Sequence, residues 1–520
     1  MASPHLEQDV KKDRRSLCTG AGRSGEILLR LKEPCIFLFC LFVSAVFITI
    51  NSKCSPLYPL QDWVDSQCFY TVGKAIAHGQ VLYQDIFDQK GPVLYFLYAL
   101  TYRLFPDTYI GVYLLEMLSF GAFLYFAAKC MRLYVDKPVI VYGMVPLLAF
   151  LITTSNAFVH GGSAEELSLF CYAYTLYSFL RMYRQDAFRR SHAFCNGVCL
   201  AFVFWIKYTM IGLQVGVILA MLVFLFAKRR FREIPRMLLY GFLGFLAMSL
   251  PVLIYFAVHR AGSALWDGYF YHNLFLYTDA SDAGSTLYGM FYALFSCIRK
   301  NLGFIIPAFV GLVWVLTRRN FETVLTIVAA VTSSIFIFIG GLNHAYYGLP
   351  LSVFALFGLT ALADWCGRIT QKRLTVFLTA IALIAAIASP FLSLKIGPNV
   401  PFMSKDRREL AQYRFAEIMN ADEAPTLLNY GFLDGGFYYA AGIVPSTRHF
   451  CTLNLTSPEI EAEINAYVAE GETDYIVTRG QKLEDLFNSI PYECIAEAPY
   501  SFENLNGSYY LYKKISPDKN

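Results

Sequence analysis

Long apolar runs separated by short polar stretches fill the chain up to about residue 394. Most of these runs approach the roughly 17–25 residues that cross a hydrocarbon core as a helix. The fold class that follows is a polytopic α-helical membrane protein, with a transmembrane domain over residues 35–394. We expect about eleven spans on this pattern, at residues 35–50, 109–128, 138–155, 165–181, 192–206, 209–227, 236–258, 302–317, 322–340, 347–363 and 374–392.

One apolar run, residues 92–105, is too short for a comfortable span and carries Tyr95, Tyr98 and Tyr102. If it crossed the membrane, the basic cluster at residues 129–137 would lie outside, against the excess of Lys and Arg that cytoplasmic loops carry. We therefore predict that this run is an amphipathic helix lying in the outer interface.

The basic residues also set the expected orientation of the chain. The tail at residues 1–34 carries seven Lys and Arg residues, which predicts a cytoplasmic N-terminus. With the short run kept at the interface, every basic cluster between spans falls on the cytoplasmic side. Residues 51–108 then form a long loop on the outer face.

Beyond residue 394 charged residues return and the apolar periodicity changes. Short runs rich in β-forming residues alternate there with helical patterns. We predict a small extracytoplasmic α/β domain over residues 395–520. Its expected strands are 426–430, 475–478, 492–496 and 509–513, and its expected helices are 404–419, 457–470 and 481–489.

The composition supports the membrane assignment. Of the 520 residues, 56% are hydrophobic and 16% are charged, whereas soluble domains have about 25% charged residues. The net charge of +4 is small and gives no reason to expect a nucleic-acid partner. We expect a multi-pass protein of the cell membrane.

The thirteen cysteines show no metal-ligand spacing, and most lie in or beside apolar runs, where cysteine acts as a small core residue. Four fall in segments expected on the outer side. Cys54 with Cys68, and Cys451 with Cys494, are therefore candidate disulfides in an oxidising compartment.

The first outer loop concentrates charged residues beside the membrane. Aromatic residues between them favour the membrane interface, and the apolar helix after Pro92 anchors the end of the loop. We expect an ordered loop that holds its carboxylates at the lipid boundary, rather than a merely solvated one. Its charged residues include Asp62, Asp65, Lys74, Asp85, Asp88 and Lys90.

Several short motifs follow the first predicted span in a recognisable order. An early aspartate, a glycine fourteen residues later and a Lys-Gly-Pro that opens an apolar helix are Asp65, Gly79 and Lys90-Gly91-Pro92. Further on come Lys207 in WIKYTM, GGLNHAYYGLPL at 340–351 and NYGFLDGGFYYAAGIVPSTRHF at 429–450. This layout resembles the C superfamily (GT-C) of membrane glycosyltransferases, in its bacterial branch related to protein O-mannosyltransferases and aminoarabinose transferases.

The resemblance implies a glycosyltransferase that takes a sugar from a polyprenyl-phosphate donor. It would transfer that sugar, with inversion, to a hydroxyl of a glycan, lipid or protein acceptor on the outer face. Such a transfer needs a carboxylate as general base, and the resemblance assigns the role to Asp65. Asp62 is the alternative base, and a helix N-cap is the alternative role for Asp65.

Cationic groups would stabilise the charge that develops on the leaving phosphate. Lys90 stands directly ahead of the interface helix, where the carrier head group would lie. Lys207 stands between two apolar runs, where snorkelling of its ammonium to the outer boundary explains it as well as phosphate binding does.

A second acidic group is expected from Asp88, Glu165 and Glu166. The two glutamates open a predicted span, so stabilisation by the helix N-terminus accounts for them equally well. In the resembled family such groups sometimes share a divalent metal, but Gln89 stands where aminoarabinose transferases have a glutamate. We therefore predict neither a metal site nor a cofactor.

Two residues in the 340–351 motif, His344 and Tyr346, are candidate contacts for the sugar or its carrier, with interfacial packing as the alternative. For the whole chain, the alternative function is a transporter or flippase of a lipid-linked or small-molecule substrate. That class would show polar or broken segments near the bilayer midplane and internal pseudo-symmetry. The sequence shows neither pattern, because its unusual polar residues lie at the outer ends of the spans.

Overall fold

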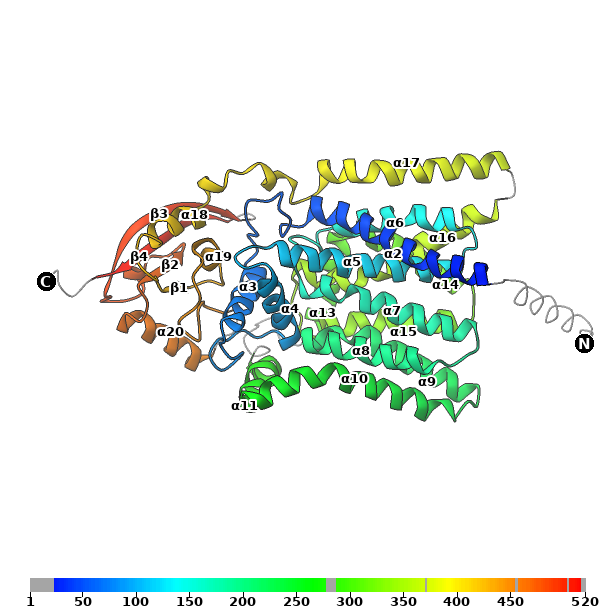
Figure 1. The fold of residues 1–520 in the computed structure, drawn as a ribbon, viewed down its shortest axis with the longest axis horizontal. Helices are drawn as coiled ribbons and strands as arrows, with labels where there is room; N and C mark the ends of the chain where they lie inside the picture. The colour runs from blue at the N-terminus through cyan, green and yellow to red at the C-terminus, as the bar shows by residue number, and fades with distance from the viewer. Residues whose placement is uncertain (1–22, 277–286, 370–371, 454–456, 503–504, 516–520) are drawn as a thin grey trace, which may run out of the picture.

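A helical bundle with a small sheet-containing domain at one end makes up the computed structural model (Figure 1). The structure describes residues 23–276, 287–369, 372–453, 457–502 and 505–515. Most of the predicted basic tail, residues 1–22, lies outside the described part.

Eleven helices of the bundle overlap the eleven predicted spans. They are α2 (Arg23–Asn51), α5 (Ile110–Arg132), α6 (Pro138–Thr153), α7 (Ala164–Arg184), α8 (Arg190–Ile206), α9 (Gly212–Ala227), α10 (Glu233–Val258), α14 (Leu302–Leu316), α15 (Phe321–Phe338), α16 (Ala355–Arg368) and α17 (Lys372–Ile396). By length and composition, six stretches in the described residues can cross a membrane, or seven if the bent pair at 287–316 counts as one span. The count of eleven therefore stays a prediction.

The outward faces of the bundle are apolar. Phe242 on α10, Phe309 on α14 and Phe391 on α17 are 61%, 65% and 67% exposed. Large apolar side chains at such exposure would be costly in water and are favourable against lipid tails. The bundle is the membrane part of the protein.

Small residues let the helices approach closely. A Cβ added at Gly197 of α8 would lie 1.9 Å from the Gly241 carbonyl oxygen of α10, and one at Gly244 would lie 1.9 Å from the Phe194 carbonyl oxygen. Without a hydrophobic driving force between helices in lipid, such backbone contact is a main source of association. These glycines fix how α8 and α10 pack.

Two short helices, α3 (Val64–Ala77) and α4 (Pro92–Leu104), lie between the bundle and the sheet domain (Figure 1). The predicted helix at 92–105 is α4. Its Tyr95 and Tyr98 are fully buried. The Tyr95 hydroxyl accepts a hydrogen bond from the Lys90 backbone amide, and the Tyr98 hydroxyl donates one to the Gly162 carbonyl. These tyrosines hold the loop together from inside, in addition to any contact that α4 makes with lipid.

Three helical segments lie in the described part of the stretch between α10 and α14. They are α11 (Gly262–Leu265), the π-helix η2 (Trp266–Leu276) and α13 (Leu287–Lys300). Two 3₁₀ segments, η1 (Tyr208–Met210) and η3 (Ala345–Phe354), connect helices at the same end of the bundle.

The C-terminal domain is a four-stranded mixed sheet in the order β1-β2-β4-β3. Its strands, β1 (Leu427–Tyr430), β2 (Tyr475–Arg479), β3 (Tyr492–Phe502) and β4 (Leu505–Lys514), fall on the four predicted runs. The β1–β2 pair is parallel and the other pairs are antiparallel.

The helices of this domain agree less well with expectation. The predicted helix at 457–470 is α20 (Pro458–Glu470), and α19 (Phe437–Ala441) is a further short helix. The predicted helix at 404–419 breaks into η4 (Val400–Ser404), η5 (Arg407–Glu409) and α18 (Ala411–Met419). The prediction at 481–489 was wrong, because only one 3₁₀ turn, η6 (Leu483–Asp485), forms there.

Candidate active site

Asp65 lies in the first turn of α3, at the end of the bundle that meets the sheet domain. The Tyr346 hydroxyl donates to Asp65 Oδ2 at 2.9 Å. Trp63 holds the N-cap position of α3 without a side-chain capping bond, so the N-cap role considered for Asp65 is wrong. A carboxylate inside the first turn is favoured by the helix dipole and keeps lone pairs available for other partners.

Asp62, the alternative base, is committed to other groups. Its Oδ1 lies 2.5 Å from Lys53 Nζ and 3.7 Å from His160 Nδ1. Burial lowers the pKa of His160, and the Lys53 charge lowers it further, so this imidazole is neutral. The His160 ring stacks on Trp63 with centroids 5.5 Å apart. Asp62 thus neutralises a buried lysine and anchors the start of α3.

Lys207 follows the end of α8 and is held in place by its neighbours. Its ammonium pairs with Glu165 Oε1 at 2.7 Å and lies 3.6 Å from the ring centroid of Tyr347. The side chain is 14% exposed. An ion pair and an aromatic face together offset the desolvation of this cation, so snorkelling alone does not describe its surroundings.

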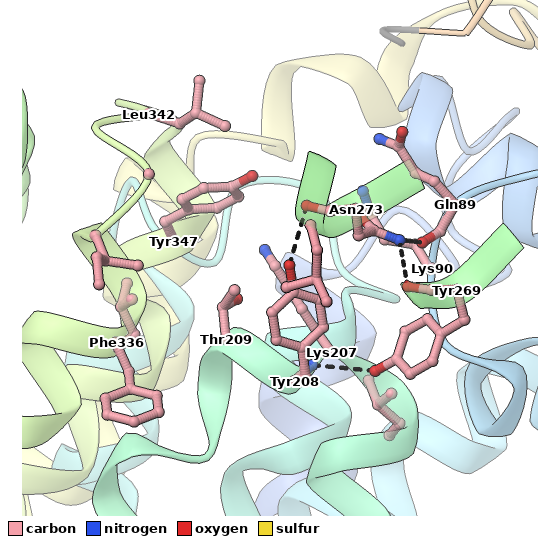
Figure 2. A pocket seen from close by; sticks show the side chains of 15 residues that line it. Gln89, Lys90, Lys207, Tyr208, Thr209, Tyr269, Asn273, Phe336, Leu342 and Tyr347 are labelled. Carbon is pink, nitrogen blue, oxygen red and sulfur yellow. Dashed lines mark hydrogen bonds between the residues drawn. The ribbon is translucent and has the colours of Figure 1, made fainter. Parts of the chain in front are cut away.

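A cavity of about 410 Å³ opens beside Lys90 and Lys207 (Figure 2). The side-chain amide of Asn273 on η2 donates to the backbone carbonyl of Gln89 at 2.7 Å. The backbone amide of Tyr208 donates to the Tyr269 hydroxyl at 3.1 Å. Most of the remaining wall is aliphatic or aromatic. The lining residues are Gln89, Lys90, Ile206, Lys207, Tyr208, Thr209, Tyr269, Asn273, Leu274, Phe336, Ile337, Ile339, Gly340, Leu342 and Tyr347.

A second, smaller pocket of about 20 Å³ shares Gln89 and Lys90 with the cavity as lining residues. Its wall is mainly polar and includes two residues of the sheet domain, Leu433 and Leu453. The other lining residues are Asp65, Cys68, Phe69, Asp88, His344 and Tyr346. An apolar cavity and a polar pocket therefore meet at one lysine.

Asp88 is buried beneath this junction, and its Oδ1 accepts a hydrogen bond from the Gln89 amide at 2.7 Å. Burial raises the pKa of Asp88 above its ordinary value, although the nearby Lys90 charge opposes that rise. The Gln89 side-chain oxygen, also buried, has no hydrogen-bond partner among the described residues. A buried unsatisfied acceptor is costly, and this one belongs to a residue that lines both pockets.

The three candidates for a second acidic group are separated by the fold. Asp88 lines the polar pocket, Glu165 pairs with Lys207, and Glu166 points into the bundle, where its Oε2 accepts from the Gly162 amide at 3.0 Å. In the described residues, no group of three or more His, Cys, Asp or Glu side chains could hold a metal ion.

The N-terminus of α7 is capped by another residue. Ser163 Oγ accepts from the Glu166 amide at 3.0 Å, so neither glutamate supplies the capping bond. Both still stand in the first turn of α7, where the helix dipole stabilises them.

Comparison with known sequences gives one family match. The sequence model of the dolichyl-phosphate-mannose-protein mannosyltransferase family matches residues 89–255. No curated protein sequence matches the chain significantly.

Among solved structures, ArnT from Cupriavidus metallidurans bound to undecaprenyl phosphate aligns with a TM-score of 0.63 at 12% identity, covering 95% of this chain and 99% of that one. The archaeal oligosaccharyltransferase AglB from Archaeoglobus fulgidus, in complex with an inhibitory peptide and a dolichol-phosphate, aligns at 0.51 and 11% identity, covering 86% of this chain and 69% of that one. The chain shares the fold of these two structures.

Sequence reasoning missed a buried acidic pair in the bundle. Glu116 of α5 accepts from Ser52 Oγ at 2.9 Å and from the Gly162 amide at 2.5 Å, the same amide that reaches Glu166. Glu116 is the only acidic residue in its apolar run, and an ionisable residue inside a span is a standard sign of function or of a buried network. That signal was present in the sequence.

The η2 residues Tyr269 and Asn273, by contrast, carried no such signal. They lie in a mixed aromatic and polar stretch whose π-helical fold and contact with Gln89 arise only from tertiary packing.

Proposed function

We propose that this protein transfers a sugar from a polyprenyl-phosphate carrier to an acceptor hydroxyl on the outer face of the membrane. The observation that carries the proposal is the junction at Lys90, where a large apolar cavity meets a small polar pocket. A lipid-linked sugar has the same division, with an apolar chain, an anionic phosphate and a polar ring. The fold likeness to ArnT with undecaprenyl phosphate and to AglB with dolichol-phosphate supports a carrier of this chemical kind.

In the proposed complex the carrier chain lies in the apolar cavity and its phosphate lies between Lys90 and Lys207. Both lysines line that cavity (Figure 2). Glu165 holds the Lys207 ammonium in position. Negative charge grows on the phosphate as the glycosidic bond breaks, so fixed cations there stabilise the transition state more than the ground state.

The sugar ring then lies at the mouth of the polar pocket, because a volume of about 20 Å³ holds little more than one water molecule. Asp65 stands at the wall of that pocket. The acceptor oxygen attacks the anomeric carbon, its proton passes to Asp65, and the carbon–oxygen bond to the phosphate breaks with its electron pair leaving on the polyprenyl phosphate. A single displacement of this kind inverts the anomeric centre. The Tyr346 hydroxyl orients the Asp65 carboxylate, and His344 lies beside both, with its ring 5.6 Å from that of Tyr346.

Asp65 suits the role of base better than Asp62. The Asp65 carboxylate is bonded to a neutral hydroxyl and lines a pocket, whereas Asp62 is paired at 2.5 Å with Lys53 and does not line that pocket. Loss of the Asp62 charge would leave a buried ammonium unpaired. We assign Asp62 a positioning role.

The placement on the outer face rests on the distribution of basic residues. Arg184 ends α7, Arg230 precedes α10 and Arg318 follows α14, all at the end of the bundle opposite α3. The positive-inside bias makes that opposite end cytoplasmic. The polar pocket and the sheet domain then face outward.

A direct test compares two donors on the purified protein in detergent or liposomes. We expect turnover with a synthetic polyprenyl-phosphate sugar and none with the corresponding nucleotide sugar, measured by release of polyprenyl phosphate. Activity with the nucleotide sugar alone would refute the carrier mechanism. Directional movement of a lipid-linked sugar across liposomes, without any transfer, would instead favour a flippase.

A further inference from the structure

Two cysteines that the sequence assigned to different candidate pairs lie against each other where α3 meets the sheet domain. The Cys68 and Cys451 sulfur atoms are 3.9 Å apart, although 383 positions separate them in the chain. Their side chains are 2% and 0% exposed. The sequence had suggested Cys54 as the partner of Cys68 and Cys494 as the partner of Cys451. In the structure the Cys54 sulfur accepts a hydrogen bond from the Gln61 side-chain amide, and Cys494 lies exposed on β3.

The backbone around both sulfur atoms is held by independent contacts. On α3, Thr71 stands one turn beyond Cys68, and its hydroxyl donates to Asp434 Oδ2 of the sheet domain at 2.6 Å. On the other side, the segment that carries Cys451 bonds to the edge of β1 through the Asn429 amide and the Phe450 carbonyl at 3.1 Å. The two cysteines are thus brought together by hydrogen bonds of neighbouring residues and not only by their own contact.

Further hydrogen bonds hold the same interface farther along the first outer loop. The Phe87 amide donates to the Arg448 carbonyl at 2.9 Å, and the Gln80 side chain donates to the Pro445 carbonyl at 2.6 Å. The cysteine pair therefore lies between two sets of hydrogen bonds in one docked interface. The sulfur atoms, 3.9 Å apart, must approach by about 1.9 Å to reach the roughly 2.05 Å of a disulfide.

We propose that Cys68 and Cys451 form a disulfide in the mature protein, which ties α3 to the sheet domain directly behind Asp65. The inference rests on the proposed function in one respect, the placement of this interface on the oxidising side of the membrane. The two thiols lose two protons and two electrons, and these reduce the disulfide of an extracytoplasmic thiol–disulfide oxidoreductase to a dithiol by exchange through a mixed disulfide.

Burial governs when this bond forms. It raises the pKa of both the Cys68 and the Cys451 thiol, so the reactive thiolate is scarce once the domain has docked. The bond must form while the interface is still opening and closing during folding. Once formed, it is shielded from soluble reductants.

The bond has a consequence for the polar pocket. Cys68 lines that pocket one turn after Asp65, and Leu433 and Leu453 of the sheet domain form the facing wall. A covalent link across the interface fixes the distance between the two walls. It also closes a very long loop, which constrains the unfolded chain strongly.

The test is peptide mass spectrometry on wild-type protein taken from membranes. Free thiols are alkylated under denaturing conditions without reductant, and the digest is compared before and after reduction. We expect a linked peptide that joins Cys68 to Cys451 and disappears on reduction. Alkylation of both cysteines without reduction, or a link from Cys68 to Cys54 or from Cys451 to Cys494, would overturn the proposal.

A control separates failure of the disulfide from failure of the topology. Cys494 is exposed on the sheet domain, so an impermeant maleimide should label it in intact cells, and Cys494→Ser should abolish that signal. If Cys494 is labelled in intact cells and the Cys68 and Cys451 thiols are both found free, the disulfide is refuted and the topology is not.

A second measurement compares melting temperatures with and without reductant. Reductant present during heating should lower the melting temperature of the wild type but not that of the Cys68→Ser/Cys451→Ser variant. Equal shifts in the two proteins would refute the disulfide.

Discussion

The apolar cavity and the polar pocket, which share Lys90, are lined by different parts of the chain. The apolar cavity is lined mainly by η1, η2 and the end of α15, together with Gln89 and Lys90 of the first loop, and its lining includes no residue of the sheet domain. The polar pocket is closed by residues from the loop around α3 together with Leu433 and Leu453 of the sheet domain. The larger cavity is thus formed without the sheet domain, whereas the smaller pocket exists only when two regions dock.

Under the proposed function, this difference gives the two spaces different parts of the chemistry. A polyprenyl chain is recognised by area and shape, which a wall of apolar side chains provides. A sugar and its acceptor are recognised by oriented polar groups, which must be held rigidly to act. Changes in the polar pocket should therefore affect the chemical step, and changes in the apolar cavity should affect carrier binding.

The largest effect is expected from Asp65→Asn. Removing the general base should lower the turnover rate by about 10²- to 10⁴-fold while the protein remains folded and inserted. Asp62→Asn is the matched control, because it neutralises the partner of Lys53 instead and should mainly lower the melting temperature. Steady-state turnover and thermal unfolding measured on both variants check this, and near-normal turnover in Asp65→Asn would remove the base from Asp65.

Lys90→Ala tests the junction itself. Loss of a fixed cation beside the leaving phosphate should lower turnover by about 10²- to 10³-fold and weaken donor binding more than acceptor binding. Lys90→Arg, which keeps the charge, should retain part of the activity. Lys207→Ala should have a smaller effect of the same kind, because Glu165 already offsets part of the Lys207 charge. If Lys90→Ala raised only the KM for the acceptor, the phosphate assignment would be wrong.

Phe336→Ala isolates the apolar cavity. Loss of aromatic area from the wall should weaken carrier binding about tenfold, because roughly 1–2 kcal/mol of apolar contact is lost, with the rate at saturating donor nearly unchanged. The effect should shrink for short-chain carriers. Phe309→Ala, on the lipid-facing side of α14, is the control and should leave the carrier Kd unaltered, as measured by titration with polyprenyl phosphate.

The smallest effect concerns the docking that closes the polar pocket. Burial raises the pKa of the Asp434 carboxyl to about 6. The protonated carboxyl therefore adds to the free energy of unfolding, fully below about pH 4. This stabilisation is lost as the pH rises through about 6. The melting temperature should fall by a few degrees from about pH 5 to about pH 7.5, and Asp434→Asn should flatten this decline.

Asp422→Asn provides the contrast for that pH experiment. The hydrogen bond from Lys513 lowers the pKa of Asp422. The ionised Asp422 therefore stabilises the folded protein at neutral pH, and this stabilisation is lost only in acid. The variant should therefore keep the decline between about pH 5 and about pH 7.5. A flat profile in the wild type would show that Asp434 is ionised at all these pH values.

The extent of prediction from sequence differed between the fold and the site. Apolar runs, basic clusters and alternating β-rich segments located the bundle helices, the helix at 92–104 and all four strands, because each of these signals is local. The short signal at 481–489 failed, since it has too few residues to distinguish a helix from a turn. The π-helix η2 was missed because its geometry depends on contacts with the first loop.

The sequence by itself determined that this chain occupies a membrane and carries an acidic, aromatic loop opening into a Lys-Gly-Pro helix. Hydrophobic length and charge bias are sums over neighbouring residues, so no tertiary contact is needed to see them. Only the tertiary structure decided that Asp62 is paired with Lys53 while Asp65 faces a pocket, that Glu165 belongs with Lys207 rather than Asp88, and that Cys68 meets Cys451. Those choices depend on distances between segments far apart in the chain, and such distances are set by packing, which no local pattern encodes.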